Sequence, residues 1–231
     1  MISALIFWLI RRYRRNHANK NSGIDLKKIK NQLFRIACIL ILVILFFSLK
    51  SHSQNRLLNY KILRNGNKVG TVRFTESNSG NMNYLQTESE VKTKFIFSFN
   101  AHAKEEAVYS NGVLQHSSIY RKLNGNEKAN KQHQVENNRY LIHAGTRASI
   151  SKVYPITYNM LCLYSKEPVN ITAVYSDNSE TFLTIQKMEA HKYKITLPEG
   201  NYNYYRYKDG VLQEIEIHHS FYSANILLVN N

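Results

Sequence analysis

Hydrophobic and polar residues alternate with a period of two along much of the chain after residue 58. The clearest stretch is Tyr84–Phe99, in which Leu85, Val91, Phe95 and Phe97 share one parity while glutamate, glutamine and lysine occupy most of the other. Successive side chains of an extended strand point to opposite faces, so this pattern predicts one buried and one solvated face. Sixteen residues is long for one strand, and we therefore expect a bend or bulge within it.

Four Asn-Gly or Asp-Gly pairs separate these strand patterns and predict tight reversals of the chain. Both residues of such a pair tolerate the positive φ angles that a type I′ hairpin turn requires. The pairs are Asn65-Gly66, Asn111-Gly112, Asn124-Gly125 and Asp209-Gly210. Successive hairpins with one polar face are typical of an antiparallel sheet. Further strand patterns occupy Arg139–His143, Ile150–Tyr154, Asn170–Tyr175, Thr181–Met188, Tyr193–Leu197 and Ala224–Val229.

One segment, Pro155–Ser165, is apolar without alternation. Proline suits the first turn of a helix, where its missing N–H costs nothing. We therefore predict a short helix over Pro155–Ser165 that plugs one end of the sheet and ends before Glu167-Pro168.

The chain is thus predicted to be all-β: a strongly curved antiparallel sheet or incomplete β-barrel of about eleven strands with one short helix, preceded by an N-terminal hydrophobic helix. So many strands exceed what an open twisted sheet usually holds, and the sheet should curl. Residues 54–231 are predicted to form a single antiparallel β domain, and residues 1–53 a basic leader.

The leader contains an uncharged apolar run, residues 36–49, with lysines and Arg35 before it. Its length is short for a membrane span and suits the core of a signal peptide. Small residues at Ser51 and Ser53 predict cleavage before Gln54 and a periplasmic mature protein. The alternative is an uncleaved anchor, in which residues 36–49 stay in the inner membrane and the β domain lies in the periplasm.

The charge distribution argues against a nucleic-acid partner, and the cysteine content argues against an intrachain disulfide. The net charge of the 231 residues is +15, but residues 1–53 hold ten Lys/Arg against one acid. The remainder is only mildly basic, so no nucleic-acid partner is expected. The two cysteines are Cys38 in the leader and Cys162 in the body, so removal of the leader leaves no partner for an intrachain disulfide.

The sequence predicts no catalytic residue, no metal site and no cofactor. The seven histidines after residue 53 match no metal-binding spacing. Only two aspartates, Asp177 and Asp209, occur there, and both fall in predicted turns. A buried Ser-His-Asp triad is therefore not expected, although a glutamate could replace the aspartate.

Tyr202, Tyr204, Tyr205 and Tyr207 are the candidate ligand-binding residues, because aromatic rings can stack on the rings of a sugar or a base. On a strand Tyr202 and Tyr204 share one face, and Tyr205 and Tyr207 share the other. The alternative is that all four pack against neighbouring strands of the sheet.

Three groups of residues resemble a known family. They are Tyr60–Gly66 with Val69-Gly70, the stretch from Leu163-Tyr164 to Glu167-Pro168, and Leu197–Gly200 leading through Asn203-Tyr204 to Tyr207. Together they resemble the exported Bacteroidota family known as domain of unknown function 6134, over most of residues 58–230. The resemblance implies export, and the family has no assigned activity that could be transferred to this chain.

Three functions remain open. The first is a non-enzymatic envelope module whose curved sheet binds a lipid-like or extended ligand, or an envelope partner. The second is a cell-envelope hydrolase that uses glutamate and histidine brought together by folding. The third is a structural or assembly protein of the envelope, which would expose an apolar patch or an unpaired sheet edge.

Overall fold

The structure is a computed structural model that describes Trp8, Arg11 and residues 55–94, 98–151, 153–220 and 222–229. The chain divides into two compact units, Met1–Ser51 and His52–Asn231, and the β domain belongs to the second. The predicted signal or anchor helix at residues 36–49 and the predicted cleavage site before Gln54 lie outside the described residues. Within the described part of the chain, no helix has both the length and the apolar character that crossing a bilayer requires.

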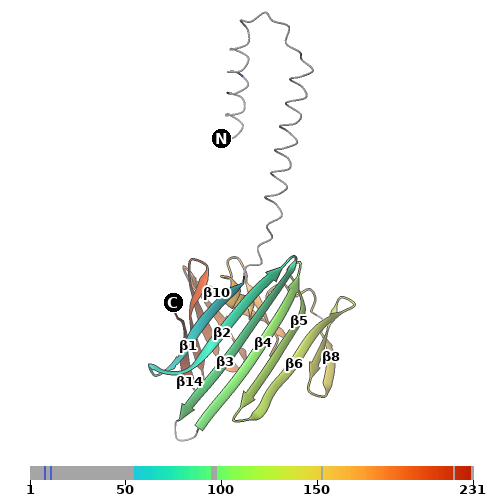
Figure 1. Ribbon diagram of the computed structural model, residues 1–231. Coiled ribbons are helices and arrows are strands. Elements are labelled where there is room, and N and C mark those ends of the chain that lie inside the picture. The colour runs from blue at the N-terminus through green and yellow to red at the C-terminus, as the bar shows by residue number, and fades with distance from the viewer. Residues whose placement is uncertain are drawn as a thin grey trace, which may run out of the picture. The chain divides into compact units, whose positions relative to one another are not determined.

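Fourteen strands of the described residues form one antiparallel sheet (Figure 1). The strands are β1 (Arg56–Arg64), β2 (Asn67–Ser79), β3 (Met82–Lys94), β4 (Ser98–Ser110), β5 (Val113–Leu123), β6 (Asn126–Glu136), β7 (Arg139–Ala144), β8 (Arg147–Ser151), β9 (Ala173–Ser176), β10 (Thr181–Glu189), β11 (Lys192–Thr196), β12 (Tyr202–Lys208), β13 (Val211–His219) and β14 (Tyr222–Leu228). Their order in the sheet is β8-β7-β6-β5-β4-β3-β2-β1-β14-β13-β12-β11-β10-β9.

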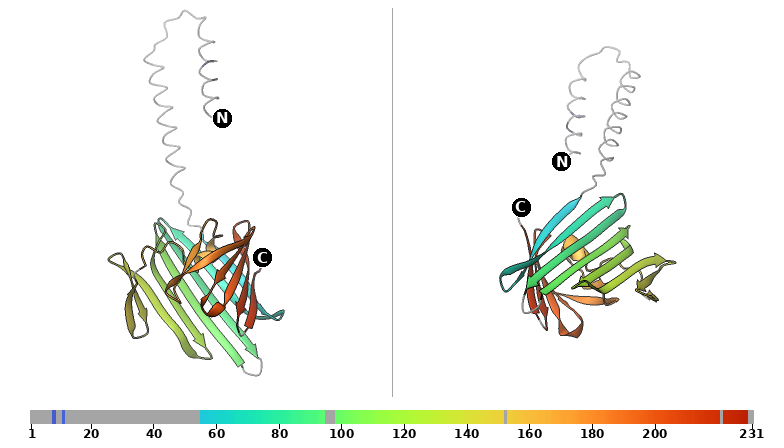
Figure 2. Two further views of the ribbon diagram at one scale, coloured as in Figure 1. Left: turned by 180° about the vertical axis from the view of Figure 1, so that it is seen from behind. Right: turned by 60° about the horizontal axis from the view of Figure 1, so that its bottom comes forward.

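The sheet consists of two meanders, β1–β8 and β9–β14, in which each strand pairs with its neighbours in sequence. They are joined by the pairing of β1 with β14, where Ile62 lies opposite Ile226. The sheet is not closed, because β8 and β9 are its two edge strands. It curves around the segment that links the meanders, as the views in Figure 2 show. The prediction of an all-β, strongly curved antiparallel sheet is confirmed.

The prediction of about eleven strands was too low. Short segments each find a hydrogen-bonded neighbour: β7 has six residues, β8 five, β9 four and β11 five. Strands this short are stable here because each belongs to one large sheet rather than to an isolated hairpin.

The prediction of one long strand over Tyr84–Phe99 was wrong. The chain reverses within this stretch, so that Lys94 at the end of β3 pairs with Ser98 at the start of β4. Partners in this hairpin have the same parity, for example Val91 opposite Ala101. The alternation of hydrophobic and polar residues therefore continues through the reversal, and no Gly or Asn marks the turn.

The predicted helix over Pro155–Ser165 is shorter than expected. Only α3 (Cys162–Ser165) is helical. Ile156 instead lies beside β5, where its carbonyl accepts a hydrogen bond from the Leu114 N–H at 2.8 Å. The sheet thus offers the first half of this segment backbone partners that a helix would have to supply internally. We call residues 153–172, including α3, the plug.

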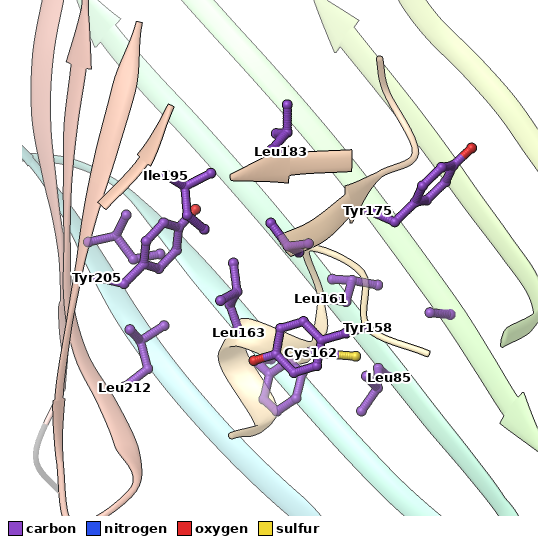
Figure 3. Packing of buried hydrophobic residues seen from close by; sticks show 14 of the residues in the cluster. Leu85, Tyr158, Leu161, Cys162, Leu163, Tyr175, Leu183, Ile195, Tyr205 and Leu212 are labelled. Carbon is purple, nitrogen blue, oxygen red and sulfur yellow. The ribbon is translucent and has the colours of Figure 1, made fainter. Parts of the chain in front are cut away.

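The plug fills part of the concave side of the sheet and contributes to its core (Figure 3). Leu161 and Leu163 of the plug are buried among side chains of both meanders, such as Leu85 of β3 and Leu212 of β13. One hydrophobic cluster therefore holds the two halves of the sheet together through the plug.

Tyrosine hydroxyls satisfy the backbone of the buried plug. The Tyr140 hydroxyl accepts a hydrogen bond from the Ile156 N–H at 3.2 Å and donates one to the Leu114 carbonyl at 2.8 Å. The Asn159 N–H donates to the Tyr109 hydroxyl at 3.1 Å. These contacts matter because a buried backbone group without a partner costs about 1–3 kcal/mol.

Two hairpins with similar sequences hold the plug from opposite meanders. They are Tyr109–Gln115, between β4 and β5, and Tyr207–Gln213, between β12 and β13. Tyr109 contacts the plug through Asn159, and Tyr207 donates its hydroxyl to the Leu163 carbonyl at 2.9 Å. Both turns have the positive φ angles predicted for them, 50° and 76° in one and 52° and 74° in the other.

Removing one of these hydroxyls should destabilise the domain. Tyr207→Phe leaves the Leu163 carbonyl without its partner, and we expect the free energy of unfolding in urea to fall by about 1–3 kcal/mol. Tyr204→Phe is the matched control, because Tyr204 lies on the opposite face of the same strand. Equal loss of stability in both variants would contradict the role given to the Tyr207 hydroxyl.

Candidate functional site

A pocket of about 460 Å³ lies on the concave face of the sheet beside the plug. This volume is within the range of about 300–1,000 Å³ that is usual for small-molecule sites. One side of the pocket is apolar and includes Ile62 of β1, Val72 of β2, Ile217 of β13 and Ile226 of β14. The pocket therefore lies where the two meanders meet.

Small side chains create this space. Ser89 and Val91 of β3 lie opposite Ala103 and Ala101 of β4, and all four line the pocket. Ala224 of β14 lines it as well. These residues occupy every second position of their strands, so their side chains point inward, and larger side chains there would fill the cavity. The filled and hollow parts of the concave face are thus set by side-chain size along the same strands.

Tyr164, in the last turn of α3, separates the pocket from the core. Its ring stacks on Phe74 with 5.6 Å between centroids and meets Tyr60 edge-on at 5.6 Å. Burial raises the pKa of the Tyr164 hydroxyl well above its usual value. The hydroxyl is therefore protonated at any physiological pH and can act as a hydrogen-bond donor.

The other side of the pocket, formed by β3, β4 and β5, is polar. The Arg121 guanidinium donates to a Glu105 carboxylate oxygen at 2.5 Å, and both residues line the pocket. Thr87 and Thr93 add hydroxyl groups, and Arg64 lines the pocket at the end of β1. Two guanidinium groups and one carboxylate therefore line the pocket.

The pocket opens at one end of the sheet. Arg64 is the last residue of β1, and Tyr222, the first residue of the neighbouring β14, is 45% exposed. Ile62 and Ile226, farther along the same two strands, are buried. Exposure therefore decreases from Arg64 and Tyr222 inward, and these two residues mark the mouth.

The four candidate tyrosines do not form one surface, and none of them lines the pocket. Tyr205 and Tyr207 are each 3% exposed and belong to the core. Tyr202 and Tyr204 lie on the outer face, where Tyr202 stacks on His218 with 4.6 Å between centroids. The Tyr202 ring also lies 4.4 Å from the Lys194 ammonium. Any stacking role is therefore left to Tyr202 and Tyr204, whose rings already pack within the sheet.

Sequence reasoning missed the pocket, although one signal was present. Inward positions of β3 and β4 next to their shared hairpin are small or hydroxyl-bearing: Ser89, Thr93, Ala101 and Ala103. A run of small residues on a face predicted to be buried indicates space rather than packing. The reversal between β3 and β4 had to be known before these residues could be placed on the same wall.

A second group of polar residues, Ser117, His133 and Asp177, is buried between β5, β6 and the turn after β9. The Ser117 hydroxyl donates to Asp177 at 2.5 Å, and the Asn159 amide of the plug donates to it at 2.9 Å. His133 Nδ1 is 3.7 Å from the same carboxylate, too far for a hydrogen bond.

This group has the composition of a Ser-His-Asp triad but not its geometry. Asp177 lies in a turn, as predicted, yet it is only 6% exposed. Ser117 is bonded to the aspartate and not to the histidine, so His133 cannot take its proton as a general base. His133 has no exposed surface, which leaves a substrate no access. The group therefore fixes the plug to the sheet.

Glutamate and histidine meet elsewhere, but away from the pocket. His102 Nε2 is 3.3 Å from Glu88 on the outer face, and His191 Nδ1 is 3.1 Å from Glu167 beside an exposed turn. None of these four residues lines the pocket. Across the described ranges, no three or more His, Cys, Asp or Glu side chains gather as a metal site would require.

Comparisons with known proteins show the family of the chain. A model of the family described as Domain of unknown function (DUF6134) matches residues 60–229. The crystal structure of a beta-barrel-like protein of domain of unknown function DUF1849 from Brucella abortus is similar, with a TM-score of 0.48 and 7% sequence identity. The similarity covers 76% of this chain and 95% of that chain. No curated protein matches the chain.

The buried polar group has a consequence for stability at low pH. Burial lowers the pKa of His133 to about 4, so between pH 6.5 and 4 only the unfolded state binds this proton, and stability falls as pH falls. Burial raises the pKa of Asp177 to about 6, so below pH 6 the native state binds a proton before the unfolded state does, and stability rises. The two effects oppose each other over nearly the same interval.

Asp177→Asn should remove the gain in stability that protonation of Asp177 brings at low pH, and leave the loss that His133 causes. Relative to the unaltered protein, we expect the variant to lose on the order of 2 kcal/mol of unfolding free energy between pH 6.5 and pH 4.5. The unfolding free energy of His133→Gln, relative to the unaltered protein, should instead rise between pH 6.5 and pH 4.5. The measurement is urea unfolding across this interval, and only the change with pH counts, not the constant offset. Parallel curves for all three proteins would contradict the assignment.

Proposed function

The chain belongs to the DUF6134 family, and from the geometry of its pocket we propose that the β domain is a non-enzymatic module that binds a lipid-like ligand. The observation that carries the proposal is a pocket of about 460 Å³ with one apolar and one polar side, open to solvent at one end. Burying hydrocarbon contributes about 25 cal/mol per Å² of apolar surface removed from water. A ligand with an apolar body and a polar group fits both sides.

The acidic residue of the pocket supports binding rather than catalysis. Glu105 is the acid that lines it, and Arg121 holds that carboxylate in an ion pair. A general acid or base must be free to exchange a proton with the substrate, whereas this carboxylate is engaged by Arg121. The cell-envelope hydrolase therefore stays the less favoured alternative, because the Glu–His contacts described above lie away from the pocket.

Export belongs to the proposal as well. The apolar run at residues 36–49 and the resemblance to an exported Bacteroidota family both support a periplasmic protein or one anchored in the inner membrane. A lipid-binding module placed there would have its ligands at hand in the adjacent membranes. The N-terminal residue of protein isolated from cells tests this part, since Gln54 is expected after cleavage.

A structural role has one observation in its favour. The edge strand β8 exposes 61% of Ile150, and an unpaired edge can accept a strand from another chain. Strand β8 is only five residues long, which limits the pairing it can offer. We therefore place assembly second to ligand binding.

Filling the pocket should abolish ligand uptake. Ala103→Phe puts a large ring into the pocket from β4, and we expect the affinity of delipidated protein for a neutral pyrene-labelled alkyl chain to fall at least about tenfold. Ala148→Phe is the matched control, because Ala148 is exposed on β8. Thermal unfolding of both variants shows whether the fold survives. If the unaltered protein takes up no probe, or if Ala103→Phe binds it equally well, the proposal fails.

A further inference from the structure

We infer that the ligand of this pocket is an amphiphile with an anionic head group, and that Arg121 is the residue that selects for the charge. This inference rests on the proposed function and names its ligand class. It starts from the Arg121 guanidinium, which lines the polar side of the pocket and keeps N–H donors beyond its contact with Glu105.

Arg121 is placed to receive an anion. It follows Tyr120 on β5, opposite Ala103 of β4, so its side chain lies over a position where the neighbouring residue is small. Its side chain is 40% exposed, whereas that of its partner Glu105 is 21% exposed. The guanidinium thus extends from the wall toward the open part of the pocket.

Arg121 also keeps donors for a ligand. A guanidinium carries five N–H donors in a planar fork, and one Nη of Arg121 contacts one oxygen of Glu105. The remaining donors can form the parallel hydrogen bonds that carboxylates and phosphates accept. Glu105 holds the guanidinium in place in this arrangement and is a positioning residue.

The apolar side of the pocket fixes how such a ligand lies. Ile62, Val72 and Ile226 face the polar wall from β1, β2 and β14. The hydrocarbon would lie against these residues and Tyr164, and the head group would face β4 and β5. Arg64 lines the pocket at its mouth.

The test compares three amphiphiles with the same saturated chain: a fatty acid, a fatty alcohol and an alkyl trimethylammonium. Each displaces the neutral pyrene-labelled alkyl chain from delipidated full-length protein. We expect the fatty acid to compete at least about tenfold better than the alcohol, and the ammonium worst, because a hydrogen bond between two charged groups is stronger than one to a neutral hydroxyl. Equal competition by acid and alcohol, or preference for the ammonium, would overturn the inference.

Two variants assign the selectivity to Arg121. Arg121→Met keeps the length of the side chain, and Arg121→Met with Glu105→Gln also removes the carboxylate that would be left unpaired. Both should bind the acid and the alcohol within about threefold of each other, a free-energy difference below 1 kcal/mol. Arg139→Met, on the exposed part of β7, is the matched control and should keep the preference of the unaltered protein. A preference for the acid that survives in the double variant would overturn the role of Arg121.

The two proposals fail in different ways. If the neutral probe binds but the head group makes no difference, the domain remains a lipid-binding module without charge selection. If neither the probe nor any amphiphile binds, the proposed function itself fails. Circular dichroism of each variant confirms the sheet before binding is compared.

Discussion

The domain depends on one constraint, which is that an irregular segment inside a curved sheet must find partners for its backbone N–H and C=O groups. A buried loop is costly because water cannot reach these groups. Here hydroxyl groups of Tyr109, Tyr140 and Tyr207 supply several of the missing partners, and the backbone of Leu114 supplies another. These three tyrosines are therefore more than strand-forming residues, since their rings pack in the core while their hydroxyls reach the plug.

The plug in turn divides the concave side into a solid and a hollow part. Leu161 and Leu163 fill the space between the meanders, and Tyr164, one residue later, forms a wall of the pocket. Binding and stability are thus coupled by neighbouring residues of one short helix. A ligand that packs on Tyr164 would bind only the folded domain and would stabilise it by mass action.

Sequence patterns predicted the sheet well because they report which face of a strand is buried and where Asn-Gly and Asp-Gly allow a positive φ. They did not reveal the reversal between Lys94 and Ser98, since parity continues through it and no turn residue marks it. They overestimated the helix after Pro155, because the hydrogen bonds that hold this segment come from strands distant in sequence. The pocket depends on both features, so sequence alone could not locate it, and the candidate tyrosines lie elsewhere.

The pairing of β1 with β14 has a consequence for how the protein is made. Strand β1 is the first of the sheet to be synthesised, yet it occupies the middle of the sheet, and one of its two neighbours is β14, the last of the described strands in sequence order. Until Tyr222–Leu228 is available for pairing, the edge at Tyr60–Leu63 has no native partner and is open to strands of other molecules. A nascent or truncated chain is therefore at risk of aggregation through β1, and protection by a chaperone would matter most before β14 pairs with it.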